Sequence, residues 1–291
     1  MKEFLKRIVR WIKKSPFAPV FKVLYSWFTV SLYWFLTLKW KSQGKGKPAK
    51  DQMDFVAENV TFIYKSFQRQ KMAKRLYRNI QRYYPKARVI IADDSKKPLK
   101  IKGEYATVVQ LPFNVGICKG LNEALSRVET PFTMRLDDDV LLTPFTRIHH
   151  QLDFLIKHPE IHIAAVQACN APFAPNPRRI ADEYINFSMD NAPKKLLIPH
   201  LTQIEGTHFV LGKVSNIFLA RTEEYKSLGY DNNIRMIDHH EFFYRAAGVL
   251  VASTDIDAFV FHYHNPFDKK YMAFRSDYLG DKAYIRKKHN L

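Results

Sequence analysis

Three consecutive carboxylates, Asp137, Asp138 and Asp139, follow a short apolar run that begins at Pro131. Neighbouring acids repel one another and are poor strand residues, so a chain that places them where a strand ends usually binds a cation there. A solvated turn of acidic residues is the alternative. The pattern therefore indicates a candidate cation site.

A second acidic pair, Asp93 and Asp94, follows the mostly apolar residues 87–92, which are typical of a buried strand. One such pair is weak support for a ligand site, because aspartate also caps helices. Two acidic clusters at equivalent strand ends are harder to explain as caps.

The elements that must position these acids alternate between strands and helices. We expect strands at 60–64, 87–92, 105–111 and 132–136, with helices at 70–84 and 119–127. Strands separated by helices predict an α/β fold with right-handed crossovers and a mostly parallel sheet. In such sheets ligands bind beyond the carboxyl ends of the strands, where both acidic clusters lie.

The second half of the chain is less regular. A helix is expected at 145–157, a strand at 161–168, and a hairpin or two strands within 202–219. Asp238 and Glu241 have the spacing of a capping box, so both acids could simply start a helix. His262 and His264 lie on one face of a predicted strand at 258–266.

Composition and charge describe a globular protein with a basic N-terminus. Over 291 residues, 46% are hydrophobic and 14% aromatic, which predicts one large domain or one domain with an appendage. The net charge is +18, and residues 1–50 hold twelve Lys or Arg against the single acid Glu3. This asymmetry favours an anionic surface as partner of the N-terminus, and no nucleic-acid motif is present. Cys118 and Cys169 lack metal-type spacing, so a reducing compartment is expected.

The N-terminal segment has the pattern of a membrane anchor. Residues 2–14 predict a basic amphipathic helix, and the aromatic block 23–38 has sixteen residues between Lys22 and Lys39, fewer than the roughly 20 that a spanning helix needs. We therefore expect an interfacial anchor at the cytoplasmic face of a membrane. A single tilted span and a helix shielded in an oligomer are the alternatives. Residues 41–48 would serve as a flexible basic linker.

Taken in order, the segments 61–95, 111–122 and 129–139 resemble the nucleotide-sugar half of GT-A fold glycosyltransferases, of the family 2 type and the related β-1,4-N-acetylgalactosaminyltransferases. The resemblance implies a Rossmann-like, mostly parallel sheet flanked by helices. It divides the chain into a membrane-association segment and linker, 1–50, and a GT-A domain, 51–291. Within the domain the nucleotide-sugar half would cover about 58–145 and the acceptor half about 146–291.

The resemblance also implies roles for the acidic clusters. Asp93 or Asp94 would read the uracil or ribose of a UDP-sugar, for which a carboxylate that accepts from the imide N–H is suited. Asp137 and Asp139 would hold Mn²⁺ or Mg²⁺ against the donor diphosphate, with Asp137 shared between metal and ribose and Asp138 structural.

Further roles follow for a loop, a helix and the histidines. Residues expected near the nucleotide are Asn114, Gly116, Lys119 and Asn122, although ordinary turn chemistry would also explain Asn114 and Gly116. His262 and His264 would complete the metal site, because an imidazole beside two carboxylates is acceptable to Mn²⁺.

The catalytic base has three candidates. Inverting enzymes of this fold keep a carboxylate in an "ED"-type motif, and an attacking hydroxyl needs such a base within hydrogen-bond reach. This chain departs from the motif and places His239 where the family often has aspartate. The base is therefore left open among Asp238, Glu241 and His239, with the carboxylates preferred.

The resemblance implies a metal-dependent, inverting glycosyltransferase that passes a sugar from a UDP-sugar to a glycan or lipid-linked acceptor, in surface polysaccharide or glycolipid synthesis. A non-catalytic GT-A-like module that binds nucleotide or glycan in a membrane assembly complex is the alternative. Turnover of a UDP-sugar distinguishes the two.

Overall fold

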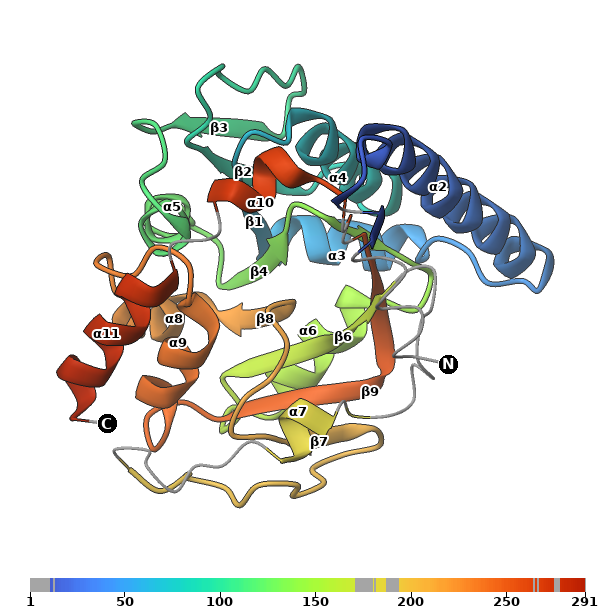
Figure 1. Cartoon of the computed structure of the whole chain (residues 1–291). Coiled ribbons are helices and arrows are strands. Elements are labelled where there is room, and N and C mark those ends of the chain that lie inside the picture. The colour runs from blue at the N-terminus through green and yellow to red at the C-terminus, as the bar shows by residue number, and fades with distance from the viewer. Residues whose placement is uncertain are drawn as a thin grey trace.

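The computed structural model describes residues 11–12, 14–170, 180, 182–186, 194–263, 265, 267–274 and 278–290. In this part of the chain one sheet of nine strands runs through the molecule in the order β3-β2-β1-β4-β8-β6-β9-β5, with β7 paired to β9 (Figure 1). The strands are β1 Val60–Ser66, β2 Arg88–Asp93, β3 Ala106–Gln110, β4 Phe132–Asp137, β5 Val140–Leu142, β6 Ile163–Asn170, β7 His208–Val210, β8 Phe218–Arg221 and β9 Ala252–His262.

The first half of the sheet is parallel, as predicted. β1 lies between β2 and β4, and the carboxyl ends of β1 and β4 are in register, with Lys65 opposite Asp137. The predicted strands and helices of this half all form, within one or two residues of the expected bounds at most ends. The two acidic clusters therefore lie at the same edge of the sheet, at the ends of β2 and β4, the two strands that flank β1.

The second half corrects the prediction of a mostly parallel sheet. β8 pairs antiparallel with both β4 and β6, and β5 and β7 pair antiparallel with β9, while β6 and β9 are parallel. β7 and β8 do not form the hairpin considered for 202–219, since each pairs elsewhere. Loops rather than helical crossovers lead into most of these strands, which removes the requirement for parallel pairing.

Helices cover both faces of the sheet because successive strand residues point to opposite sides. Phe62 and Tyr64 of β1 pack on one face against α3, α4 and α6, whereas Ile63 packs on the other against α5, α8 and α9. The bounds of these helices are α3 Lys50–Asn59, α4 Gln70–Tyr83, α5 Ile117–Leu125, α6 Ile148–Lys157, α8 Thr222–Leu228 and α9 Asp238–Ala246. Three further helices are α7 Asp182–Ile185, α10 Lys269–Phe274 and α11 Tyr278–His289.

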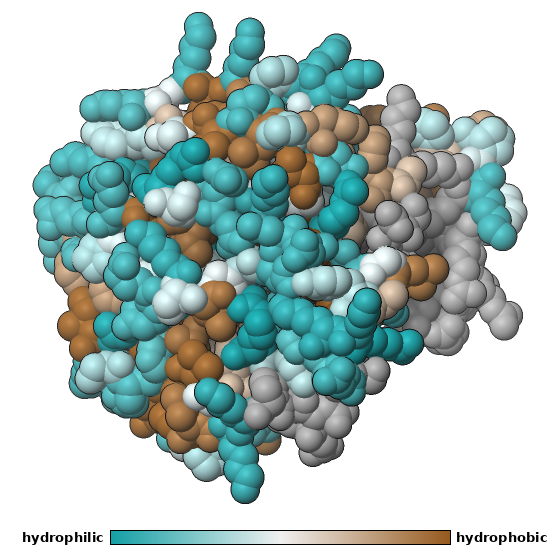
Figure 2. Space-filling view, turned by 90° about the vertical axis from the view of Figure 1, so that its left-hand side faces the viewer, coloured by the Kyte–Doolittle hydropathy of each residue, from teal (hydrophilic) through white to brown (hydrophobic). Residues whose placement is uncertain are grey.

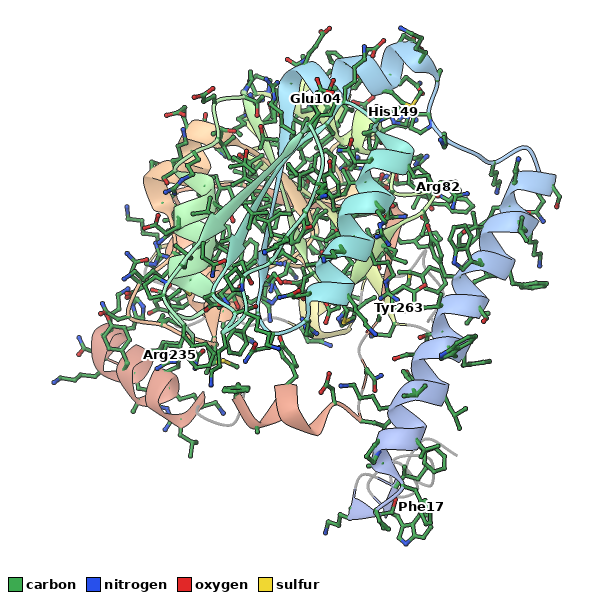
Figure 3. The ribbon with its side chains drawn as sticks, turned by 90° about the horizontal axis from the view of Figure 1, so that it is seen from above. Phe17, Arg82, Glu104, His149, Arg235 and Tyr263 are labelled. Atoms are coloured by element: carbon green, nitrogen blue, oxygen red, sulfur yellow. The ribbon has the colours of Figure 1, made fainter. Side chains whose placement is uncertain are left out.

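The aromatic block near the N-terminus forms α2, Ala18–Ser42, which lies beside α4 (Figure 3). Tyr33 is buried, and its hydroxyl donates to the Leu142 carbonyl at 3.0 Å and accepts from Asn79 Nδ2 at 2.8 Å. Asn79 also accepts the Leu142 N–H at 2.6 Å. The helix is therefore docked on the domain. Residues 2–10 and 13 of the predicted amphipathic helix lie outside the described residues.

The remaining face of α2 exposes large apolar side chains. They include Val20, Val23, Leu24, Trp27, Phe28, Trp34, Phe35 and Leu38. Among the helices of the described chain, none combines the length and apolarity that a membrane crossing requires. The side of the molecule with α5 and α11, at the left of Figure 1, is mostly hydrophilic (Figure 2).

Candidate functional site

A pocket of about 230 Å³ lies beyond the carboxyl ends of β1 and β4. Its polar lining comes from strand ends, from the loop before α5, from the start of α9 and from the end of β9. The predicted site residues that line it are Asn114, Gly116, Asp137, Asp139, Asp238 and His262. Asp138, which was expected to be structural, also lines the pocket. Residues far apart in the sequence thus converge where an α/β sheet binds its ligand.

Arg69 joins two of the three consecutive aspartates. It follows β1, and its guanidinium donates to Asp139 Oδ2 at 2.9 Å and to Asp138 Oδ1. Burial would raise the pKa of Asp139, but the hydrogen bond from His262 and the charge of Arg69 lower it. Burial raises the pKa of Asp138 to about 7, although Arg69 opposes the rise. Asp139 is therefore held as a carboxylate within the pocket.

Arg135 connects the first aspartate to the start of α9. It is fully buried in β4, and its guanidinium lies 2.8 Å from Asp137 Oδ1 and 3.2 Å from Asp238 Oδ2. Because a buried arginine needs compensating charge, these two carboxylates fix its position, and it in turn fixes theirs. The acidic turn and the base candidate Asp238 are thus positioned by one side chain.

His262 stands at the end of β9 beside the aspartates, as predicted. Its Nε2 lies 3.5 Å from Asp139 Oδ1, and its Nδ1 lies 2.6 Å from Asn170 Oδ1. Burial lowers the pKa of His262, but the neighbouring Asp139 outweighs it and the pKa is raised. His264, the second predicted metal ligand, lies outside the described residues.

The acidic pair after β2 divides its roles. Asp94 accepts from Lys65 Nζ at 2.5 Å, and Lys65 lines the pocket. Asp93 is turned into its own loop, where it accepts from Ser95 Oγ at 2.6 Å and from the Leu99 N–H at 2.6 Å. The structure therefore gives Asp93 a loop-forming role and leaves Asp94, through Lys65, as the acid nearer the pocket.

The loop before α5 explains why glycine occupies position 116. Gly116 has φ +98°, and a Cβ there would lie 2.9 Å from the Cα of Arg235. The Ile117 N–H donates to the Arg235 carbonyl at 2.9 Å, and Arg235 Nη2 donates to the Asn114 carbonyl at 2.8 Å. Close backbone approach is thus required, and it joins the loop to the segment that precedes α9.

Lys119 and Asn122 lie on α5 and do not line the pocket. Lys119 is exposed, whereas Asn122 donates from Nδ2 to the Tyr230 carbonyl at 2.7 Å and accepts the Tyr230 N–H at 2.9 Å. Residue type alone did not show whether Asn122 would contact a nucleotide or, as the structure has it, hydrogen-bond the backbone of Tyr230.

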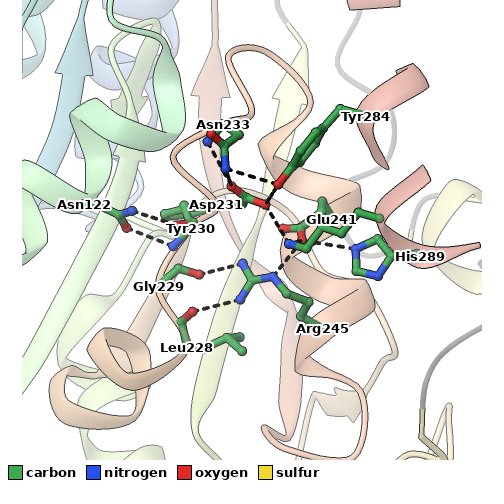
Figure 4. A network of polar contacts seen from close by, with 11 residues as sticks. Asn122, Leu228, Gly229, Tyr230, Asp231, Asn233, Glu241, Arg245, Tyr284 and His289 are labelled. Atoms are coloured by element: carbon green, nitrogen blue, oxygen red, sulfur yellow. Dashed lines mark hydrogen bonds and ion pairs between the residues drawn. The ribbon is translucent and has the colours of Figure 1, made fainter. Parts of the chain in front are cut away.

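Two of the three base candidates are occupied elsewhere. Glu241 is buried on α9 and pairs with Arg245 Nε at 2.8 Å, Lys288 Nζ at 2.7 Å and His289 Nε2 at 3.3 Å (Figure 4). His239 Nε2 is bonded to the Val214 carbonyl, and burial holds the pKa of His239 well below its usual range. Only Asp238 of the three lines the pocket.

We expect a Glu241→Gln variant to lose stability rather than chemistry. Its carboxylate joins α9 to α11, and removing one partner of a buried ion pair costs about 3–5 kcal/mol. Because Lys288 and Arg245 are partly exposed and can be hydrated, we expect a loss near 2–3 kcal/mol, measured by urea unfolding. A matched change at the exposed Glu223 should have little effect. Unchanged stability in Glu241→Gln would contradict the structural role.

The cations and the aromatic wall of the pocket were not predicted from the sequence. Arg69 follows a strand as the aspartates do, and Arg135 is the one charged residue among the buried residues 132–136 of β4, so both positions carried a signal. Phe67 packs edge-on against Phe274 of α10 at 5.1 Å between ring centroids, and Arg69 lies 3.9 Å from the centre of the Tyr271 ring. α10 therefore contributes one wall of the pocket.

The carboxylates and the imidazole of the pocket suit a divalent cation, although Arg69 and Arg135 pair with two of the carboxylates in this structure. Carboxylates and an imidazole are suitable ligands for Mn²⁺, and Asp137, Asp139 and His262 all line the pocket. Within the described residues, no three histidine, cysteine or carboxylate side chains come close enough together to hold an ion. A cation that binds Asp139 would compete with Arg69 for it.

A parallel half-sheet that ends in the acidic turn is continued by antiparallel strands, which is a GT-A-like arrangement. The structure has this mixed α/β fold. The model of "Glycosyl transferase family 2" matches residues 61–217, over half of the chain. The chain belongs to this family, as the sequence resemblance indicated.

Known proteins show the same likeness. The chain is 31% identical over 237 residues to human (Homo sapiens) "Beta-1,4 N-acetylgalactosaminyltransferase 1", covering 78% of this chain and 42% of the human protein. It thus spans less than half the length of that relative. The structure resembles S. aureus TarS 1-349, with TM-score 0.53 and 16% identity over 70% of this chain and 60% of the TarS 1-349 chain. It also resembles GalNAc-T7 with UDP, GalNAc and Mn²⁺, with TM-score 0.52 and 10% identity over 80% and 55% of the two chains.

Proposed function

We propose that the protein is a metal-dependent, inverting glycosyltransferase that moves a hexosyl or N-acetylhexosaminyl group from a UDP-sugar to a glycan or lipid-linked acceptor. The observation that carries this proposal is the convergence of Asp137, Asp139, Asp238 and His262 on one pocket at the switch from parallel to antiparallel strands. The relatives support it, since one is an N-acetylgalactosaminyltransferase and one neighbour holds UDP and Mn²⁺.

The metal would be held by Asp139 and Asp137, with His262 beside them. A divalent cation supplies positive charge for the departing nucleoside diphosphate. The chain's own cations line the same pocket, since Lys65, Arg69 and Arg235 all face it. They add to the electrostatic stabilisation of a leaving group that carries several negative charges.

Asp238 would act on the acceptor. It is the base candidate with access to the pocket, and Arg135 orients its carboxylate at 3.2 Å. A carboxylate there can accept the proton of an attacking hydroxyl while the sugar leaves the diphosphate on the opposite side. One base and one displacement give inversion at the anomeric carbon.

Release of UDP from a panel of UDP-sugars, with and without added Mn²⁺, tests the proposal. UDP release that requires the metal is the expected result. UDP binding without turnover of any donor would instead indicate the alternative, a non-catalytic module that binds nucleotide or glycan in an assembly complex.

We further propose that the protein acts at the cytoplasmic face of a membrane, bound through α2. The outer face of that helix exposes Leu24, Trp27 and Phe35 over 58%, 73% and 63% of their surfaces, a pattern that suits an interfacial helix. A basic residue accompanies this face, since the guanidinium of Arg82 lies over the Trp34 ring at 4.9 Å from the ring centre. Such an arrangement fits an anionic bilayer and a lipid-linked acceptor.

Replacing both Leu24 and Trp27 by serine should weaken binding to vesicles that contain anionic lipid. Burial of one large apolar side chain is worth about 1.5–3 kcal/mol, so we expect at least a tenfold loss in a sedimentation assay. Leu279→Ser is the matched control, because Leu279 is 67% exposed on α11. Equal loss in the control would contradict a specific role of α2, and a change of oligomeric state would indicate a protein partner instead.

A further inference from the structure

A second cavity, of about 670 Å³, lies between α2, the first turn of α4 and the segment that follows β9. Tyr25 and Thr29 line it from α2, and Tyr263, which lies between α2 and α4 in Figure 3, lines it from the other side. Asn265 fastens the segment after β9 to α2 by donating to the Lys22 carbonyl at 3.1 Å and to Ser26 Oγ at 2.9 Å. The cavity is thus a built feature of the docked helix.

This cavity adjoins the pocket that we assign to the donor. Arg69 lines both, and it holds Asp138 and Asp139 on the donor side. The N–H of Tyr263 donates to the Asp139 carbonyl at 2.7 Å, so the floor of the cavity is tied to the acidic turn. A ligand in the cavity would therefore lie next to the reacting groups without occupying the nucleotide pocket.

The cavity has an excess of positive charge. Its cationic side chains are Lys22, Arg69, Lys71, Arg75 and Lys97, and its single acid is Asp268. Asp268 pairs with Lys22 at 2.8 Å, and Arg69 forms ion pairs with Asp138 and Asp139 of the donor pocket. Among the described residues, no carboxylate pairs with Lys71, Arg75 or Lys97. Within the described part of the chain, these three cations thus face one cavity and none of them is paired with a carboxylate.

Of the three cations, Arg75 gives the strongest indication of an anionic ligand. It is half-buried on α4, and its guanidinium stacks on the ring of Tyr263 at 4.4 Å from the ring centre. Burial lowers the pKa of Arg75, because charge is costly away from water. The first turn of α4 holds no acidic residue and its N-cap makes no side-chain hydrogen bond, so the helix end adds to the positive potential. An anionic ligand would compensate these groups.

We propose that this cavity is an acceptor subsite that binds the phosphate group of a lipid-linked acceptor. The inference rests on the proposed function, and it adds the chemistry by which the acceptor is recognised. Lys71, Arg75 and Lys97 bind the phosphate, and the lipid chain leaves along α2, whose outer face is apolar. Guanidinium groups bind phosphate oxygens by charge-assisted, often bidentate hydrogen bonds. A phosphate monoester or diester on a lipid and free phosphate share this chemistry, so the test must separate them.

Calorimetric titration with decyl phosphate, in the presence of saturating UDP and Mn²⁺, tests the proposal. The donor pocket is then filled, so any further binding belongs to another site. We expect decyl phosphate to bind, decanol not to bind, and inorganic phosphate to bind more weakly than decyl phosphate. Inorganic phosphate that binds as tightly as decyl phosphate would overturn the lipid assignment, and absence of decyl phosphate binding would overturn the subsite.

Variants assign the binding to this cavity. Arg75→Gln should lower the affinity for decyl phosphate by about tenfold or more, since a hydrogen bond to a charged group is worth about 1.5–3 kcal/mol. Lys71→Gln is a second variant on an exposed position, which keeps the test valid if Arg75→Gln lowers the melting temperature. The matched control is Arg78→Gln, an equal loss of charge at an exposed position of α4 outside the cavity.

The outcome of these titrations separates the two proposals. Equal loss in Arg75→Gln and Arg78→Gln would show a nonspecific charge effect and overturn the subsite, even though UDP still binds. Failure of the wild-type protein to bind UDP at all would instead contradict the proposed function. Weakened decyl phosphate binding with normal UDP affinity in Arg75→Gln is the result that supports the subsite.

Discussion

An Asp139→Asn variant should release UDP from its sugar donor at least about a hundredfold more slowly than the wild-type protein. Asp139 lines the pocket, contacts Arg69 at 2.9 Å and His262 at 3.5 Å, and is held as a carboxylate by both. The amide keeps the size of the side chain but removes the charge that would bind a divalent cation. Initial rates at several Mn²⁺ concentrations measure the effect, and the variant should need more metal.

The control for this prediction is Asp153→Asn, a change at an exposed acid on α6. It should leave both the rate and the metal requirement unchanged. Thermal melting of Asp139→Asn separates loss of metal from loss of structure, because the variant also loses its ion pair with Arg69. A folded variant with wild-type UDP release would remove Asp139 from the metal site.

An Asp238→Asn variant should lose about 10²–10⁴ in the rate of sugar transfer, the range contributed by a general base. We propose Asp238 as the base because it lines the pocket, while Glu241 pairs with Arg245 of α9 and Lys288 of α11, and the His239 ring is hydrogen-bonded to the Val214 carbonyl. Transfer kinetics should show the loss in kcat rather than in the KM for the donor. The affinity for UDP provides the separate measurement of donor binding.

His239→Gln is the comparison that decides between the base candidates. Its ring is half-buried, is hydrogen-bonded to the Val214 carbonyl and does not line the pocket. The amide of glutamine can still donate to that carbonyl, so we expect kcat to remain within a few-fold of wild type. A loss in His239→Gln as large as that in Asp238→Asn would reverse the assignment.

The parallel half of the fold could be predicted from sequence because its signals are local. Apolar runs of strand length alternate with amphipathic helices from residue 60 to 137, and crossovers then dictate parallel neighbours. The same logic placed Asp137 and Asp139 at the sheet edge. The antiparallel half depends on pairings between β4, β6, β8 and β9, which are set by contacts between segments up to about a hundred residues apart.

The site was predicted by residue type, and type alone could not decide which way a side chain points. Asp93 and Asp94 are adjacent, yet one closes its own loop and the other accepts from Lys65. Asn122 and Glu241 have suitable chemistry for a ligand, but each satisfies the backbone or cations of another element. Arg69 and Arg135 were missed because their partners only become neighbours once the sheet has formed.

The clamp between Tyr33, Asn79 and Leu142 has a consequence for how far an acceptor can reach. It fixes the angle and depth of α2 relative to the sheet, because all three hydrogen bonds are buried or short. If α2 lies in the bilayer interface, the pocket is held at a fixed distance from the lipid surface. Acceptors would then be selected by the distance between their hydroxyl group and the membrane. For a lipid-linked glycan, that distance depends on the number of sugars already attached.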